Sequence, residues 1–216
     1  MSADTLEMLG QALLETIYMV GLSALFSVII GSILAVIMIV TAPDGLHPVR
    51  WVYKVLDVLV NILRSFPFVI LIVVLVPATR AIVGTSVGTT ASIVPLTIAA
   101  APFVTKVIEG SLREVNPGVI EAAKSFGASD AQIIFRVMIK EAMPSIMSGI
   151  ILTIINLVGY SAMAGAIGGG GLGYVAISYG YERFETDITV YTVIILIIFV
   201  QLVQGFGDLI YKKLSK

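Results

Sequence analysis

The sequence predicts an all-α membrane protein with five transmembrane helices. Of its 216 residues, 58% are hydrophobic and only 12% are charged, and the mean hydropathy is +1.04. Soluble domains, by contrast, carry about 25% charged residues. Five apolar blocks are each long enough to cross about 30 Å of hydrocarbon, which takes about 20 helical residues. We therefore expect a single transmembrane domain over residues 1–216, with no soluble module attached.

The expected spans lie at about residues 13–40, 55–76, 91–108, 144–167 and 188–210. An odd number of spans places the two termini on opposite sides of the membrane. Basic side chains gather in one set of alternate connections, at Arg50, Lys54, Lys106, Arg113, Lys124, Arg136, Lys140, Lys212, Lys213 and Lys216. The opposite set holds only Arg80 and Arg183. Because basic loops tend to stay in the cytoplasm, we expect the N-terminus outside and the C-terminus in the cytoplasm.

The connection between the third and fourth spans, residues 116–143, is polar and rich in helix signals. Asn116 followed by Pro117 is a typical helix start, since asparagine caps a helix and proline fits its first position. Gly127 suits a left-handed helix end. Ser129 with Gln132 three residues later matches a capping box, which opens a second helix. We expect two short helices on the cytoplasmic face, joined at the glycine, with the second running from residue 130 to about 143.

This connection also carries side chains suited to a contact with another molecule. Ala122 and Ala123 are small enough for a neighbouring backbone to approach closely. Apolar contact area comes from Ile120, Phe126, Ile133 and Ile134. The pattern predicts either docking of a helix into the groove of a partner protein or an amphipathic segment on the lipid headgroups.

A family resemblance separates these two interpretations. The residues that carry it are Glu121-Ala122-Ala123, Gly127, Val137, Ile139 and Pro144, which resemble the EAA motif of binding-protein-dependent ABC importer permeases. The resemblance implies a coupling loop that contacts a partner ATPase through Glu121, Ala122, Ala123, Lys124 and Gly127. The family's usual proline after the second hydrophobic position is Lys140 here, so we expect the second helix to run straighter.

Nearly the whole chain resembles the permease subunit of methionine importers. The matching stretches are RSFPF (64–68), IVGTSVG (82–88), IVPLT (93–97), GYSAMAGAIGGGGLG (159–173) and YGY (179–181). The resemblance implies a type I ABC importer permease fold and a homodimer in the bacterial cytoplasmic (inner) membrane. It also implies two ATP-binding subunits and an extracytoplasmic substrate-binding lipoprotein. The implied substrate is methionine, with D-methionine and methionine derivatives as further candidates.

No motif in the sequence predicts catalysis. The chain has no G-x-x-x-x-G-K-[ST] phosphate loop, no H-E-x-x-H, no G-x-S-x-G and no cysteine. The G-x-G-x-x-G at Gly168, Gly170 and Gly173 lacks the preceding strand that dinucleotide binding requires. We expect a non-catalytic subunit with no metal site, no cofactor of its own and no nucleic-acid partner. ATP and magnesium would be bound by the partner ATPase.

Two alternative functions remain open at this point. One is a permease for another amino acid or small ligand. The other is a self-contained channel or secondary carrier. A carrier is expected to place more titratable side chains within its spans, where only Asp57 and Arg64 qualify.

Polar side chains within the second span form a stripe. Asp57, Asn61 and Arg64 are spaced so that a helix places them on one face. Because charges inside a membrane are usually paired, we expect Asp57 and Arg64 to form a pair. The alternatives are a polar lining of the pathway, or an Arg64 that extends to the interface.

The prolines of the spans and the single histidine give further expectations. Prolines in the second and third spans predict kinks at Pro67, Pro77, Pro95 and Pro102. His47, the only histidine, lies in a turn and is expected to be solvent-exposed.

The fourth span carries the candidate gate. The residues concerned are Asn156, Tyr160, Ser161 and Met163, which lie among small residues. Small side chains let two subunits approach closely, so we hypothesise that Met163 of each subunit narrows a shared pore. The alternative is an ordinary packing methionine. The glycine run at 168–171, on the outer side, predicts either close helix packing or a moving gate or receptor-contact loop.

Overall fold

The computed structural model describes residues 3–215, which are helices and connecting loops without strands. The α-helices are α1 (Ala3–Thr41), α2 (Arg50–Ser65), α3 (Phe68–Val83), α4 (Thr89–Arg113), α5 (Pro117–Ser125), α6 (Asp130–Gln132), α7 (Ile139–Ala164), α8 (Gly171–Val175) and α9 (Thr186–Leu214). Three π-helical turns adjoin them, at η1 (Ile133–Met138), η2 (Gly165–Gly169) and η3 (Ala176–Tyr181).

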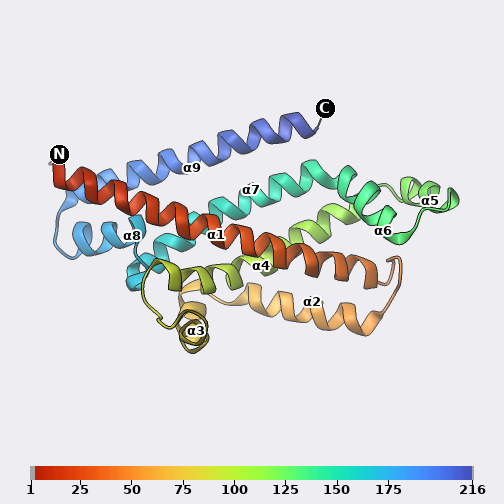
Figure 1. Cartoon of the computed structure of the whole chain (residues 1–216), viewed down its shortest axis with the longest axis horizontal. Coiled ribbons are helices and arrows are strands. Elements are labelled where there is room, and N and C mark those ends of the chain that lie inside the picture. Colours follow the sequence, from red (N-terminus) through yellow and green to blue (C-terminus); the bar gives the residue numbers. More distant parts are fainter. Residues whose placement is uncertain (1–2, 216) are drawn as a thin grey trace.

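The helices form an elongated bundle with two distinct ends. Figure 1 shows the N-terminus and α8 at one end, and α5 and α6 at the other. Helix α4 lies at the centre, where it packs most extensively on α1 and also contacts α7, α3 and α2. Helix α9 flanks the bundle and packs on α7 and η3. The polar connection is therefore held at one end, far from α8.

Within the described residues, four helical stretches are long and apolar enough to cross a membrane, and α2 with α3 makes a fifth as a bent pair. The four are Ala3–Thr41, Thr89–Arg113, Asp130–Gly169 and Thr186–Leu214. Each extends beyond its expected apolar block. The first has 39 residues, which corresponds to about 58 Å at 1.5 Å per residue, so it projects well past about 30 Å of hydrocarbon.

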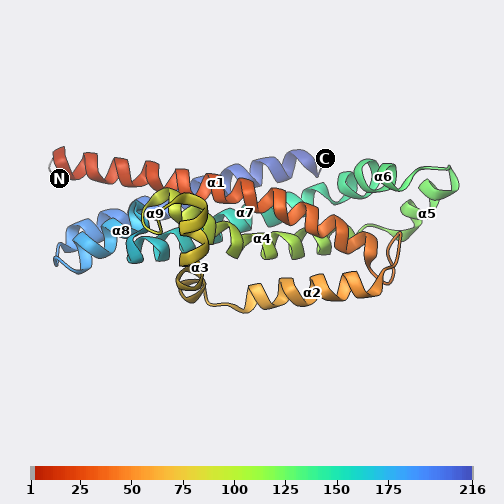
Figure 2. The same cartoon turned by 60° about the horizontal axis from the view of Figure 1, so that its bottom comes forward.

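The second expected span, residues 55–76, is not one helix. It breaks at Phe66 and Pro67, where α2 and α3 meet at 111°. Figure 2 shows α2 running beside α4 before the chain turns into α3, which crosses that direction. The break follows from Pro67, because proline drives the preceding residue out of the helical region, and Phe66 is extended with ψ 127°. The other three prolines lie inside α3 and α4 without interrupting them.

The second helix of the polar connection and the fourth span are continuous, contrary to the boundary expected at residue 143. One helical stretch runs through Asp130–Gly169, with Pro144 inside it. A proline removes only one hydrogen bond, and the backbone remains helical on both sides of this one. Just before Lys140 the helix contains the π turn η1, where the Ile139 N–H donates to the Ile134 carbonyl. The straighter course expected from Lys140 stays a prediction.

An ionic network joins α2 to α4 near the end that carries α5. The Lys106 ammonium lies 2.5 Å from Asp57 Oδ1 and 2.8 Å from Glu109 Oε2. Glu109 Oε1 also accepts hydrogen bonds from Tyr53 Oη at 3.0 Å and from Arg113 Nε at 3.3 Å. The Glu109 side chain is only 4% exposed, so its charge is compensated almost entirely within the protein.

The expected Asp57–Arg64 pair is therefore wrong. Asp57 pairs with Lys106 of the neighbouring helix, and Arg64 has no ion-pair or hydrogen-bond partner within residues 3–215. The physical reason is distance along the helix, since seven residues correspond to about 10 Å of axial rise. A cation on an adjacent helix at the same depth reaches the carboxylate more readily.

Glycines at the α8 end allow close backbone packing. A Cβ at Gly165 would overlap the backbone nitrogen of Tyr174, and one at Gly173 would overlap the carbonyl oxygen of Ala162. In the run itself, Gly168 has a φ of 90°, a conformation that side chains disfavour. A Cβ at Gly169 would lie 2.7 Å from the Ala164 carbonyl oxygen, and one at Gly171 would lie 2.7 Å from Thr16 Oγ1, so the close packing expected of residues 168–171 is confirmed. The role as a moving gate or receptor-contact loop stays a prediction.

The ionic network leads to a first prediction. Lys106→Met leaves Asp57 and Glu109 without their shared cation and is expected to lower the free energy of unfolding by about 3 kcal/mol, because breaking a buried ion pair leaves an uncompensated charge. Denaturant unfolding of the detergent-solubilised protein measures this. Arg64→Met is the matched control and should not lower stability, because Arg64 has no partner to lose within residues 3–215. Equal losses in both variants would contradict the assigned pairing.

Candidate functional site

Helix α5 begins and ends as its sequence predicts. Asn116 Oδ1 accepts a hydrogen bond from the Gly118 N–H at 2.8 Å, and Pro117 occupies the first turn. After α5, Gly127 takes a φ of 76°, and its N–H donates to the Lys124 carbonyl at 2.9 Å. The left-handed corner is thus confirmed.

The capping box after the corner is also present. The Ser129 N–H donates to Gln132 Oε1 at 2.9 Å, and the Gln132 N–H donates to Ser129 Oγ at 3.4 Å. These two bonds satisfy backbone donors that have no partner within the helix. They start α6, which leads directly into η1 and α7.

The five expected coupling residues divide by exposure. Glu121, Ala122, Lys124 and Gly127 are exposed. Ala123 is half-buried and packs, together with Ile120, against the hydrophobic cluster beneath α5. Because α5 turns one face to the bundle and the opposite face to solvent, its exposed face is available to another molecule.

Phe126 is the most exposed large apolar side chain of this region, at 91%. It directly precedes the left-handed Gly127, where the chain reverses from α5 toward α6. An exposed aromatic ring gives up few contacts within its own chain when a partner covers it, and its apolar surface is then removed from water.

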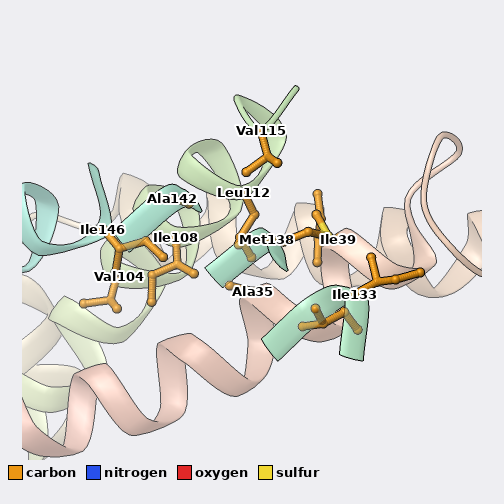
Figure 3. Close-up of a cluster of buried hydrophobic side chains, with 11 residues drawn as sticks. Ala35, Ile39, Val104, Ile108, Leu112, Val115, Ile133, Met138, Ala142 and Ile146 are labelled. Atoms are coloured by element: carbon orange, nitrogen blue, oxygen red, sulfur yellow. The ribbon is translucent and has the colours of Figure 1, made fainter. Parts of the chain in front are cut away.

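Two of the apolar residues expected at a partner contact are instead buried within this chain. Ile133 is 1% exposed and Ile134 is 6% exposed. Figure 3 shows Ile133 in a cluster with Ile39 of α1, Leu112 of α4 and Met138 of η1. The expectation for these two residues is wrong, because η1 continues into α7 and so turns this face against α1 and α4.

A cavity of about 300 Å³ lies between α5 and the bundle. Its lining includes Ile39 of α1, Leu112 and Arg113 of α4, and Glu121 of α5. Exposed side chains, among them Asp44 and Lys124, also line this cavity, so it opens to solvent beside α5. The cavity leaves room for α5 to shift relative to α1 and α4.

His47 is exposed, as expected, but it has a partner that the sequence does not reveal. Its Nε2 lies 2.6 Å from Asp130 Oδ2, and its side chain is 68% exposed. The contact ties the α1–α2 loop to the first residue of α6. The two residues are separated by 83 positions, and local sequence patterns carry no information about such a pair.

The four candidate gate residues occupy different faces of α7. Asn156, Tyr160 and Met163 follow helical spacing along one face, and Met163 is 47% exposed on the surface of the chain. Ser161 points away from them: it is 2% exposed, and its hydroxyl donates to the Val158 carbonyl at 2.8 Å. The structure thus groups three of the four residues and places Ser161 in the interior.

At the opposite end, α1 supplies a cap that sequence reasoning missed. Glu15 Oε2 accepts from the Gly171 N–H at 2.7 Å, and Thr16 Oγ1 accepts from the Leu172 N–H at 2.9 Å. These bonds satisfy the first backbone donors of α8, which has no cap from its own N-cap residue. The signal that reveals Glu15 is its place within the expected first span, residues 13–40. Lys106 likewise lies within the expected third span, residues 91–108, so the expectation that only Asp57 and Arg64 are titratable residues within the spans is wrong.

Two known permeases are similar to this chain over nearly its whole length. A probable D-methionine transport system permease protein of Vibrio cholerae is 45% identical over 209 residues, which cover 97% of this chain and 93% of that protein. A methionine import system permease protein of Bacillus subtilis is 44% identical over 208 residues, covering 96% of this chain and 94% of that protein.

Two solved structures are similar to this chain in fold. A chain of the inward-facing MetNI methionine ABC transporter, from a crystal form soaked with SeMet, matches with a TM-score of 0.97 and 40% identity over 100% of both chains. A chain of an amino acid ABC transporter shares the fold at a TM-score of 0.79 and 19% identity, covering 99% of this chain and 100% of that chain.

The family described as binding-protein-dependent transport system inner membrane component matches residues 27–216. That match takes in α4, the polar connection with its capped helices, and α7. The fold is that of a type I ABC importer permease. From the extent of these likenesses, the chain belongs to the binding-protein-dependent transport system inner membrane component family.

Proposed function

We propose that this protein is the permease subunit of an ABC importer that carries methionine across the bacterial cytoplasmic membrane. The observation that carries this proposal is the 45% identity, over 97% of the chain, to a probable D-methionine transport system permease. The superposition on a methionine ABC transporter chain supports it. D-methionine and methionine derivatives belong to the same proposed substrate class.

The proposed assembly contains two copies of this chain, two ATP-binding subunits and an extracytoplasmic substrate-binding lipoprotein. Five spans are few to enclose a pathway, and a homodimer supplies ten. The N-terminus lies outside and the C-terminus in the cytoplasm, which places α5 on the cytoplasmic side. The distribution of basic residues supports this orientation.

In the proposed mechanism, α5 transmits motion from the ATPase to the spans. Closure of the ATP-binding subunits displaces α5, and the cavity behind it gives the helix room to move. The hydrophobic cluster beneath α5 includes residues of α1, α4, η1 and α7, so it carries the displacement to several spans at once. The spans then rock between inward-open and outward-open states.

Uptake of labelled methionine by liposomes tests the proposed function. The liposomes hold the complete complex, and unlabelled amino acids serve as competitors. ATP-dependent uptake that excess methionine suppresses most strongly is the expected result. Uptake suppressed equally well by an unrelated amino acid would assign the permease to another substrate.

Phe126 gives a prediction for the ATPase contact. Phe126→Ala is expected to weaken binding of the ATP-binding subunit by about tenfold or more, because an aromatic hot-spot residue contributes about 2 kcal/mol or more and about 1.4 kcal/mol corresponds to tenfold. The thermal stability of the isolated permease should not change, since this ring is exposed. Phe184→Ala is the matched control, because Phe184 is 87% exposed near the opposite end of the bundle. Equal binding of the ATPase by both variants would remove Phe126 from the contact.

Gly127 gives a prediction for the corner. Gly127→Glu combines a disfavoured backbone conformation with a bulky charge at the contact, and it is expected to abolish substrate-stimulated ATP hydrolysis while the permease still inserts. Gly127→Asn is the control, because asparagine tolerates a positive φ and adds no charge. ATP hydrolysis and uptake in liposomes measure both. Normal uptake by the glutamate variant would refute the role of this corner.

Met163 gives a prediction for the gate. We propose that Met163 of each subunit narrows the shared pore, since its side chain is exposed on the single chain and lies among small residues. Met163→Ala is expected to increase ATP-independent leakage of methionine from loaded liposomes. Met147→Ala, on the same helix toward α5, should leave leakage unchanged. No change in either leakage or uptake for the Met163 variant would exclude the gate.

A further inference from the structure

A second cavity lies at the break between α2 and α3. It has a volume of about 150 Å³ and is partly open, with Ala99 and Phe103 of α4 and Tyr160 of α7 in its wall. Four aromatic rings contribute to its lining, from Phe66, Phe68, Phe103 and Tyr160, and the one charged side chain in the lining is Arg64. The site is distinct from the cavity behind α5.

The aromatic wall is fixed in place. The Phe68 and Tyr160 rings stack with their centroids 4.7 Å apart and an interplanar angle of 15°. Phe68 is 7% exposed and belongs to the hydrophobic cluster formed with α1, α4 and α7. A preformed aromatic surface favours apolar and thioether groups, because sulfur makes favourable contacts with aromatic rings.

Arg64 is the unusual member of this lining. Arg64 is exposed on the single chain and lies beside the break within the bent span. A guanidinium inside a span is costly, and such groups are retained where they meet a partner or a water-filled pathway. Its candidate partner, Asp57, is held by Lys106, and Arg64 itself has no partner in the described part of the chain. An unpaired guanidinium presents a planar set of donors that matches a carboxylate.

The position of the cavity fits a transported ligand. The chain is non-helical at Phe66 and Pro67, between two helices that together make one span. At membrane depth, irregular backbone is tolerated only where protein covers it or where it lines a water-filled cavity. The break sets Arg64 and Phe66 in the wall of this cavity.

We infer that this cavity is a binding subsite for the transported amino acid within the membrane. The carboxylate of the ligand pairs with Arg64, and its uncharged side chain lies against Phe103 and the stacked pair. A volume of about 150 Å³ suits one side chain better than a peptide. The lining contains no carboxylate, so a cationic side chain finds no partner there. This inference rests on the proposed methionine transport and deepens it.

The test uses the complete transporter in liposomes, with three variants. Arg64→Gln removes the cation, Arg64→Lys keeps it without the bidentate geometry, and Phe103→Leu keeps an apolar side chain without the ring. Arg80→Gln is the matched control, because Arg80 lies at the far end of α3 and bonds to Ser86 outside the cavity. Unfolding midpoints and chromatographic profiles establish that each variant assembles.

Two measurements follow for each variant. Initial uptake of labelled methionine is expected to fall about tenfold or more in Arg64→Gln and several-fold in Phe103→Leu, with partial recovery in Arg64→Lys. ATP hydrolysis stimulated by the loaded binding protein should persist in all of them, because the ATPase contact is unchanged. A diazirine analogue of methionine should label peptides of α4 or α7 in the wild type and the control, and label them less in Arg64→Gln.

The outcomes distinguish a failure of the proposed subsite from a failure of the proposed function. Wild-type uptake of methionine, together with uptake and labelling in Arg64→Gln equal to the control, would overturn the subsite and leave the function standing. Failure of the wild-type complex to take up methionine would overturn the function, and the methionine subsite with it. Labelling confined to peptides outside the lining of the cavity would show that the ligand does not occupy it, which also overturns the proposal.

Discussion

The close contact between α1 and α4 is the interaction on which the rest of the bundle depends. A Cβ at Gly31 would lie 2.7 Å from Val104 Cβ, so glycine is what lets the two backbones approach. The Ser27 hydroxyl adds a hydrogen bond to the Thr97 carbonyl at 3.2 Å. In hydrocarbon, helices associate through such packing and hydrogen bonds rather than through the hydrophobic effect. Helices α2, α3 and α7 then pack on α4, and α8 packs on α1.

Helix α1 also links the two ends of the molecule. Near its start, Glu15 and Thr16 hold the first residues of α8. Near its end, Ala35 and Ile39 belong to the cluster that supports η1 and α5. A displacement of α5 therefore acts on a helix that reaches the opposite end. This connection gives a physical route by which an event at one membrane face alters packing at the other.

The break between α2 and α3 is where the bundle departs most from a set of simple spans. On one side of it, the ion pairs of Lys106 with Asp57 and Glu109 hold α2 against α4. On the other side, Arg64 has no partner among the described residues and lines a cavity with aromatic rings. The two regions thus divide the polar stripe of α2 into a structural part and a part that is free to meet a ligand.

The sequence by itself determined the fold class, the number of apolar blocks and the capped helices around Gly127. These features arise from composition and from contacts within a few residues, such as the bond from Gly118 to Asn116. Only the tertiary structure decided that Asp57 pairs with Lys106, that Ile133 is buried and that the second span breaks into two helices at 111°. The physical reason is that in a membrane every face of a span is apolar enough to meet lipid. Which face meets protein, and which polar group finds a partner, is therefore set by how the helices pack and not by periodicity along the chain.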